Sequence, residues 1–227
     1  MSRRTFDKNQ LRRIVMIALF GAVSYVLMLL IHIPVRFLTM DIKDVIITLA
    51  GLYFGPLAAV VLSVTVPFLE MITVSATGPY GLVMNILGTA SFSVTASLIY
   101  KHKKNLFGAI VGLVSGVGVM VAAMLAFNLL VTPQYLKLPV EVVRGMIPTL
   151  LLPFNLLKGI LNMGFVLLLY KPISAIMQRA GILPRSERAY RMDLRSVLIL
   201  IASLLLIAGS LALIFFVLGG GFQWGLK

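Results

Sequence analysis

The stretch PFNLLKGILNMGFVLLLY, residues 153–170, is strongly apolar but carries one lysine, Lys158, near its middle. A membrane-crossing helix needs about 20 mostly apolar residues, and a charge inside it costs free energy unless it faces a cavity or a partner. Four residues at i, i+3, i+4 and i+7 share one helical face here: Asn155, Lys158, Gly159 and Asn162. The stretch therefore predicts a membrane helix with one polar stripe.

The rest of the chain repeats this apolar character. Of its 227 residues, 60% are hydrophobic, which is more apolar surface than a soluble domain can bury. The composition predicts an all-α integral membrane protein with six core helices and a seventh C-terminal one. The expected segments are 13–31, 41–53, 57–74, a fourth ending at Tyr100, 106–131, 146–177 and 196–218, with loops at 32–44 and 132–145.

The expected second segment, 41–53, is short. At about 1.5 Å per residue it barely reaches across a core of about 30 Å. We therefore expect this helix to be tilted, extended, or partly enclosed by the rest of the protein.

Basic residues are distributed unevenly along the chain, whose net charge is +13. Fourteen of the 20 Lys and Arg residues lie before the first segment, around residues 101–104, or between 171 and 195. This placement predicts a cytoplasmic N-terminus and, with seven spans, an external C-terminus. It also indicates contact with anionic lipid rather than nucleic acid. The predicted divisions are a basic N-terminus (1–12), a membrane domain (13–178), a basic linker (179–195), and a final helix and tail (196–227).

Several kinds of chemistry are disfavoured by the residues present. There is no cysteine, the two histidines stand far apart, and no phosphate-binding loop or zinc-protease motif occurs. We therefore expect no metal, no catalytic residues and no cofactor. A membrane-embedded enzyme and a purely structural protein remain as disfavoured alternatives.

Lys158 has two interpretations. It could pair with Asp41, Asp44 or Glu70 for structure alone, but these are expected near the outer helix ends, about three turns from Lys158. A stripe of carboxamides and one ammonium instead favours a cavity for a neutral, hydrogen-bonding solute. On this interpretation, replacing Lys158 with Met lowers ligand affinity and leaves the ligand-free protein as stable as before or more so.

Other polar groups lie at membrane depth or at segment ends. Asn128 is expected to bond across helices. The spacing of Asp41 and Asp44 favours a helix cap and a first-turn acid, although Asp44 could instead close over a ligand. The turn TGPYG, residues 77–81, reverses the chain and allows a flat ligand to approach its backbone, with Asn85 one turn further on.

Two faces carry small residues at four-residue spacing: Ala18 and Ala22, and Gly108, Gly112 and Gly116. Such faces allow helices to approach closely in lipid. Each can serve packing inside the protein or contact with a partner's helix.

Taken together, these motifs resemble a known family. The sequence has an AxxxA first span, DIKD after an apolar loop, AGLYFGPLAAV, TGPYGLVMN, YKHKK, Asn128 before TPQY, and FNLLKG. Over about residues 13–179 it resembles the substrate-binding S component of energy-coupling factor (ECF) transporters, and within that family the riboflavin-binding branch. The resemblance implies a six-helix protein of the bacterial cell membrane that binds one vitamin near its outer face, with the first outer loop as a lid.

The resemblance also implies residue roles. It assigns Asn155, Lys158 and Asn128 to hydrogen bonds with the ligand, and Asp44, Thr77 and Gly78 to the cavity lining. Asn85, after the turn, and Leu38 and Thr39, in the first outer loop, complete the predicted ligand-binding residues. The resemblance assigns Ala18 and Ala22 to contact with a transmembrane coupling protein (T component), which sits on two ATPases. Another vitamin, such as thiamine, pantothenate or a folate, is the alternative ligand. The seventh span and the pair Pro67 and Glu70 depart from the family pattern.

Overall fold

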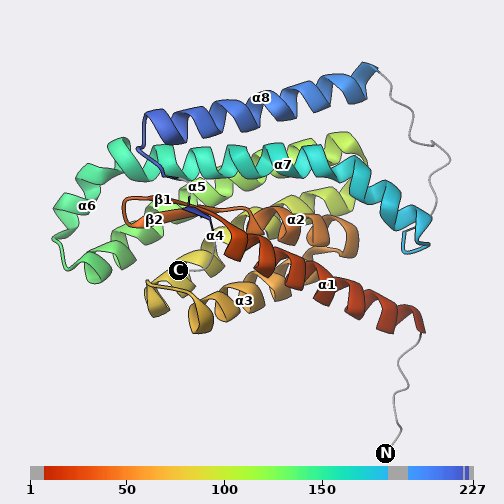
Figure 1. Cartoon of the computed structure of the whole chain (residues 1–227), viewed down its shortest axis with the longest axis horizontal. Helices are drawn as coiled ribbons and strands as arrows, with labels where there is room; N and C mark the ends of the chain where they lie inside the picture. The colour runs from red at the N-terminus through yellow and green to blue at the C-terminus, as the bar shows by residue number, and fades with distance from the viewer. Residues whose placement is uncertain (1–7, 184–193, 222, 225–227) are drawn as a thin grey trace, which may run out of the picture.

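The computed structural model describes residues 8–183, 194–221 and 223–224, and these are almost entirely helical (Figure 1). The helices follow the uncharged runs of the sequence. Their bounds are α1 Lys8–Leu30, α2 Lys43–Phe54, α3 Pro56–Thr73, α4 Gly78–His102, α5 Leu106–Leu136, α6 Val140–Met146, α7 Leu152–Arg179 and α8 Leu194–Phe216. Among the described residues, six helical segments are long and apolar enough to cross a membrane, with α6 and α7 counted as one. The predicted all-α membrane fold is confirmed.

Helix α2 is the exception among the core helices. It has 12 residues, and all of them except Tyr53 are buried. Gly51 allows this enclosure, because a Cβ at that position would collide with the side chains of Ser97 on α4 and Ala59 on α3. The short second segment is therefore surrounded by the other helices, as one of the sequence-based alternatives expected.

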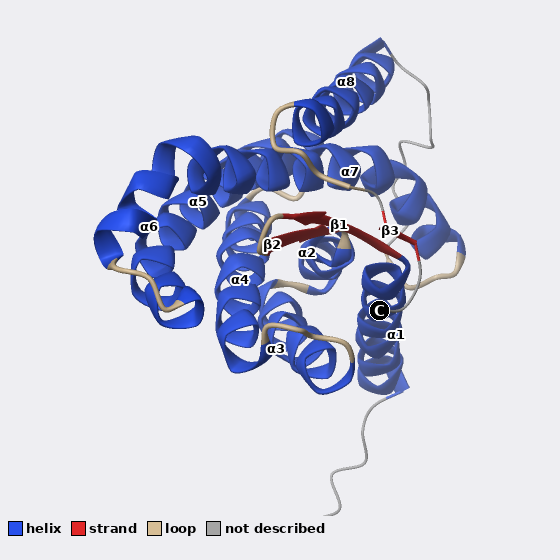
Figure 2. Cartoon of the chain, turned by 60° about the vertical axis from the view of Figure 1, so that its left-hand side comes forward, coloured by secondary structure: helices blue, strands red, loops and turns tan. Residues whose placement is uncertain are grey.

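The first expected loop is in fact a β-hairpin. Strand β1 (Ile31–Val35) pairs antiparallel with β2 (Leu38–Asp41), and Arg36 adopts a left-handed backbone conformation in the turn (φ 55°). The hairpin lies between the helices rather than above them (Figure 2). An alternation of side chains was the missed signal, because Ile33 and Met40 face one way and the paired His32 and Asp41 face the other.

The second expected loop, 132–145, is mostly helical. Helix α5 continues to Leu136 through Pro133, and α6 follows after a short turn at Lys137. A π-helical turn, η1 (Ile147–Leu151), then leads into α7. The expected sixth segment thus begins as a broken helix, with prolines at 148 and 153.

The two small-residue faces have different surroundings. Gly112 and Gly116 lie against the backbone of α4, where an added Cβ would come within 2.7 Å of the Ala96 carbonyl oxygen and 2.8 Å of that of Phe92. Ala18 and Ala22 are exposed on the outside of α1. The glycine face therefore serves internal packing, and the alanine face is open to lipid or to a partner.

Helix α8 confirms that an apolar seventh segment exists. It runs antiparallel to α7 and returns toward the hairpin (Figure 1). Lys171 on α7 donates a hydrogen bond to Ser196, which lies near the start of α8. Beyond α8, strand β3 (Gln223–Trp224) joins the hairpin to give a sheet in the order β2-β1-β3. Most of the predicted basic linker, and the side chain of Trp224, lie outside the described residues.

Candidate functional site

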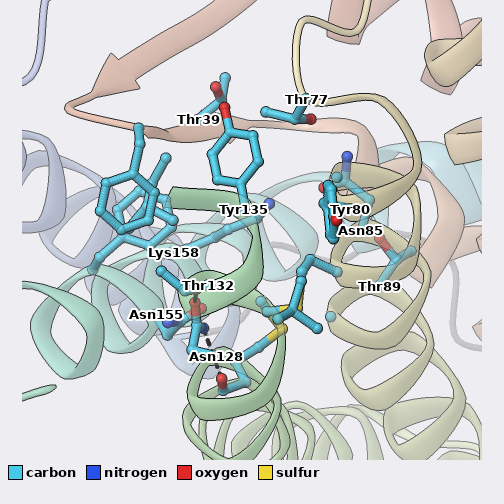
Figure 3. Close-up of a pocket in the computed structure, with 18 of the residues that line it drawn as sticks. Thr39, Thr77, Tyr80, Asn85, Thr89, Asn128, Thr132, Tyr135, Asn155 and Lys158 are labelled. Carbon is cyan, nitrogen blue, oxygen red and sulfur yellow. Dashed lines mark hydrogen bonds between the residues drawn. The ribbon is translucent and has the colours of Figure 1, made fainter. Parts of the chain in front are cut away.

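The candidate site is a cavity under the β1–β2 hairpin, walled by the α3–α4 turn and by helices α4, α5 and α7 (Figure 3). Its empty space, with the open mouth included, is about 860 Å³. A second hollow, which extends along β1 to the end of α1, shares part of its lining. The shared residues are Phe37, Thr39, Asp41, Glu70, Thr77 and Tyr135.

A cluster of charged side chains forms one wall of the cavity. Lys158 Nζ lies 3.4 Å from Asp41 Oδ2 and 3.5 Å from Asp44 Oδ2. Lys43 is fully buried beside them, 2.7 Å from Asp41 Oδ2 and 3.1 Å from Glu70 Oε2. Three carboxylates and two ammonium groups therefore meet here, with Lys43, Asp41 and Asp44 buried and Lys158 and Glu70 slightly exposed to the cavity.

The charges of this cluster stabilise one another. Burial by itself raises the pKa of the Asp41 carboxyl, but the neighbouring ammonium groups of Lys158 and Lys43 outweigh burial and hold that pKa well below its usual range. Asp41 therefore stays ionised and accepts hydrogen bonds from the backbone N–H and the ammonium of Lys43.

The expected difference in depth between Lys158 and the carboxylates is wrong. Lys158 lies fewer than two turns from the first residue of α7, because α6 and η1 take up the residues before it. The hairpin also folds inward and carries Asp41 down to the same level. Lys158 thus lines the cavity and pairs with carboxylates at once, so the two interpretations are not exclusive.

Asp44 lies in the first turn of α2, as its spacing predicted, whereas the predicted cap Asp41 is not the residue at the helix start. Asp44 is buried behind the cavity wall, where its carboxylate accepts hydrogen bonds from Thr89 (2.6 Å) and Asn162 (3.2 Å). The residue at the helix start is Ile42, which makes no side-chain cap. Asp44 and Asn162 are absent from the lining, so this part of the predicted polar stripe supports the wall instead of facing the cavity.

Two carboxamides line the end of the cavity away from the hairpin, Asn128 on α5 and Asn155 on α7 (Figure 3). Asn128 Nδ2 bonds the Met124 carbonyl in its own helix, and its Oδ1 accepts from Thr132. The expected bond across helices is therefore not seen. Asn155 Nδ2 donates to the Leu151 carbonyl, at the end of the π-helical turn. A carboxamide has two N–H donors and one acceptor, so capacity remains for a ligand.

The opposite end of the cavity is formed by the hairpin and the α3–α4 turn. Leu38, Thr39 and Thr77 line it, as predicted, and Asn85 lies deeper, where it donates to Glu70 Oε2 at 3.1 Å. Gly78 does not line the cavity. Its positive φ of 54° starts α4, so its part is the sharp turn.

Aromatic and thioether side chains complete the lining, and sequence reasoning did not single them out. Tyr80 and Tyr135 approach each other across the mouth, with ring centroids 5.9 Å apart (Figure 3). Phe154 and three methionines also line the cavity: Met84, Met120 and Met124. Glu70 and Asp41 also line the cavity, although neither was predicted to bind a ligand. Tyr80 and Tyr135 belong to the TGPY and TPQY motifs, so those motifs carried the signal.

A third hollow lies at the other end of the bundle, where the basic residues gather. Its lining includes Arg12, Arg13, Lys101 and Lys104, and the two arginines donate hydrogen bonds to backbone carbonyls. Arg12 donates to Gly181 and Ala180, and Arg13 donates to Phe54. None of the four acidic residues that the structure describes lies near these cations. This distribution agrees with the predicted charge asymmetry.

Comparison with known proteins agrees with this architecture. Residues 12–174 match the family described as ECF transporter, substrate-specific component. A solved S component of a bacterial ECF transporter superposes with a TM-score of 0.64 at 31% identity, over 75% of this chain and 99% of that one.

Two curated relatives are similar over most of their lengths. The riboflavin transporter RibU of Staphylococcus aureus (strain TCH60) is 32% identical over 192 residues, which cover 78% of this chain and 98% of the relative. The riboflavin transporter FmnP of Bacillus subtilis (strain 168) is 27% identical over 169 residues, 66% of this chain and 86% of the relative. With the family match covering more than half of its residues, the chain belongs to the substrate-specific S components of ECF transporters.

Proposed function

We propose that this S component binds riboflavin in the cavity under the hairpin and delivers it for uptake. The observation that carries the proposal is the lining itself. It places carboxamides at one end, hydroxyls at the other and aromatic rings between them (Figure 3). The names of the relatives RibU and FmnP point to the same ligand.

The chemistry of riboflavin fits such a lining. Its flat ring system has a uracil-like edge of alternating donors and acceptors, which the amides of Asn128 and Asn155 complement. Tyr80 and Tyr135 offer aromatic faces to the rings. The hydroxyls of its ribityl chain match Thr39, Thr77 and the ammonium of Lys158.

Energy for transport comes from partners in this proposal. The family implies a T component and two ATPases of an ECF module, and the exposed Ala18 and Ala22 face is the part of α1 that a partner helix can approach closely. The N-terminus and the basic hollow are cytoplasmic, and the hairpin faces outward.

Titration of the purified protein with riboflavin, followed by quenching of flavin fluorescence, tests the proposal. Asn155→Leu and Asn128→Leu should each weaken binding about 10–100-fold, since each removes hydrogen bonds and leaves a buried ligand group unpaired. Lys158 is a poorer probe, because it also pairs with Asp41.

Asn105→Leu is the matched control. Asn105 caps α5 at the far end of the bundle, where its side chain accepts from the Gly108 N–H at 2.8 Å. Its replacement costs about 1 kcal/mol of stability and should leave affinity unchanged. Tight binding of thiamine, pantothenate or folate, without binding of riboflavin, would overturn the assignment.

A further inference from the structure

The chain extends beyond the part that the family match covers. That match ends at residue 174, and α8 and β3 follow it. Helix α8 is docked firmly on α7, because an added Cβ at Gly164 would come within 2.9 Å of Ile207 Cγ1 and 3.3 Å of the Ser203 carbonyl oxygen. The question is what this additional helix does.

The residues after α8 lead back to the hairpin. The chain turns at Gly219, where φ is 68°, and Gly220 packs between α8 and β1. An added Cβ on Gly220 would lie 2.8 Å from Ile214 Cγ2 and 3.2 Å from Ile33 Cγ2. The backbone N–H of Gly221 then donates to the Pro34 carbonyl at 3.3 Å.

Strand β3 completes this attachment. It pairs antiparallel with β1, with Ile31 opposite Trp224 and His32 opposite Gln223. Since the sheet order is β2-β1-β3, the tail occupies the edge of the hairpin that β2 leaves open (Figure 2). An unpaired strand edge is prone to pair with other backbone, and here the chain's own C-terminal tail fills it.

The two faces of the hairpin have different surroundings. Its tip and one face line the ligand cavities through Phe37, Thr39 and Asp41. The other face is apolar and shares one buried cluster with α7 and α8. The hairpin contributes Ile33, Val35 and Met40, α8 contributes Ile207 and Ile214, and the turn after α8 contributes Leu218. The hairpin cannot swing away from the cavity without leaving this cluster or separating from the tail.

We propose that α8 and the tail (Gly219–Gly221 with β3) form a clasp that holds the hairpin over the cavity. Ile33, Leu218 and Gly220 are its positioning residues: they touch no ligand but fix the hairpin residues that do. Release of the clasp limits the rate of ligand entry and exit. The inference rests on the proposed function, because the hairpin acts as a lid only if the cavity takes a ligand.

The chain offers a clean test because it has no cysteine of its own. The pair Ile33→Cys and Gly220→Cys places two thiols within disulfide reach, since the Gly220 Cβ position lies 3.2 Å from an atom bonded to the Ile33 Cβ. Oxidation should slow both association and dissociation of riboflavin at least about tenfold, with a smaller change in Kd, because opening is blocked. A reducing agent should restore both rates.

A second cysteine pair controls for fixing α8 in general. Gly164→Cys with Leu206→Cys joins α7 to α8 at residues outside the cluster that contains the hairpin, since the Gly164 Cβ position lies 3.4 Å from Leu206 Cβ. This pair should leave both rates unchanged when oxidised. Exchange that is equally fast in oxidised and reduced Ile33→Cys/Gly220→Cys protein overturns the clasp. If the pair fails to crosslink, the tail is not seated on β1, and the clasp is overturned on that ground.

Hydrogen exchange gives a readout that needs no ligand, so it separates the clasp from the proposed function. Gly220→Val, which crowds Ile33 and Ile214, should raise exchange of the amides of residues 31–41 about tenfold or more. Gly221→Ala is the matched control, because a Cβ there meets nothing within 4 Å. Unchanged hairpin exchange in Gly220→Val refutes the clasp, whether or not riboflavin binds. If Gly220→Val shows the faster exchange and the wild-type protein binds no riboflavin, only the assignment of the ligand is refuted.

Discussion

Lys158 and Asp41 are 117 residues apart in sequence, yet Lys158 Nζ lies 3.4 Å from Asp41 Oδ2 at the wall of the cavity. One comes from α7 and the other from the end of β2, so this ion pair joins the hairpin to the helix that carries the polar stripe. It also connects the ligand cavity to the fully buried Lys43. Substitutions here therefore affect folding and binding together.

Replacing Lys158 with Met should destabilise the ligand-free protein, contrary to the expectation from the sequence. The change leaves three carboxylates facing Lys43 alone, and breaking a buried pair costs about 3–5 kcal/mol. Thermal unfolding of purified protein in detergent measures it. The double variant Lys158→Met/Asp41→Asn should lose less stability than the two single variants together, because the two groups interact directly. If Lys158→Met melts at or above the temperature of the wild-type protein, Lys158 does not stabilise the fold and serves ligand binding alone.

Lys43 should be more important for folding than for binding. It is fully buried and its ammonium contacts both Asp41 and Glu70. Lys43→Met should lower the free energy of unfolding by about 3–5 kcal/mol or prevent accumulation of folded protein. Lys101→Met is the control, since Lys101 is exposed at the basic end of the bundle and its loss should change stability by less than about 0.5 kcal/mol. Equal melting temperatures for the two variants would contradict this role.

The two small-residue faces should respond differently to added volume. Ala22→Leu should leave riboflavin binding by the purified protein intact and strongly reduce uptake by cells, because Ala22 is exposed where a partner helix approaches. Val23→Leu is the control and should retain uptake, because Val23 is also exposed on α1 but lies about 100° around the helix from Ala22. Gly112→Leu should instead prevent folding, since α4 backbone occupies the required space. Loss of binding in Ala22→Leu would show that the alanine face serves internal packing.

A reporter fused to the C-terminus should be on the outside of the cell. Helix α8 runs antiparallel to α7 and returns to the hairpin end of the bundle (Figure 1), and the basic residues gather at the opposite end. Alkaline phosphatase fused after Lys227 should therefore be active, and a fluorescent protein that folds only in the cytoplasm should be dark. The reverse pattern would show that the assigned orientation is wrong or that α8 does not span the membrane.

The sequence by itself determined the class of protein, its main helices and the face of α7 that carries Asn155 and Lys158. These features are local: an uncharged run long enough to cross lipid and a period of 3.6 residues are both visible within one segment. The motifs TGPYG and FNLLKG were also specific enough to indicate the family, which the comparisons confirm. The enclosure of α2 was foreseen as one of several options, because its length alone ruled out a simple span.

Only the tertiary structure decided which polar groups meet. The strands of the hairpin have five and four residues, too few for their alternation to stand out from an apolar loop. Asp44 lies in the first turn of α2 as predicted, but it is also a buried acceptor, because Thr89 and Asn162 from two other helices donate hydrogen bonds to it. The attachment of the C-terminal tail to β1 joins segments almost 200 residues apart. Such contacts depend on how helices pack and on which strand edge is left open, and neither is encoded within a single segment of the chain.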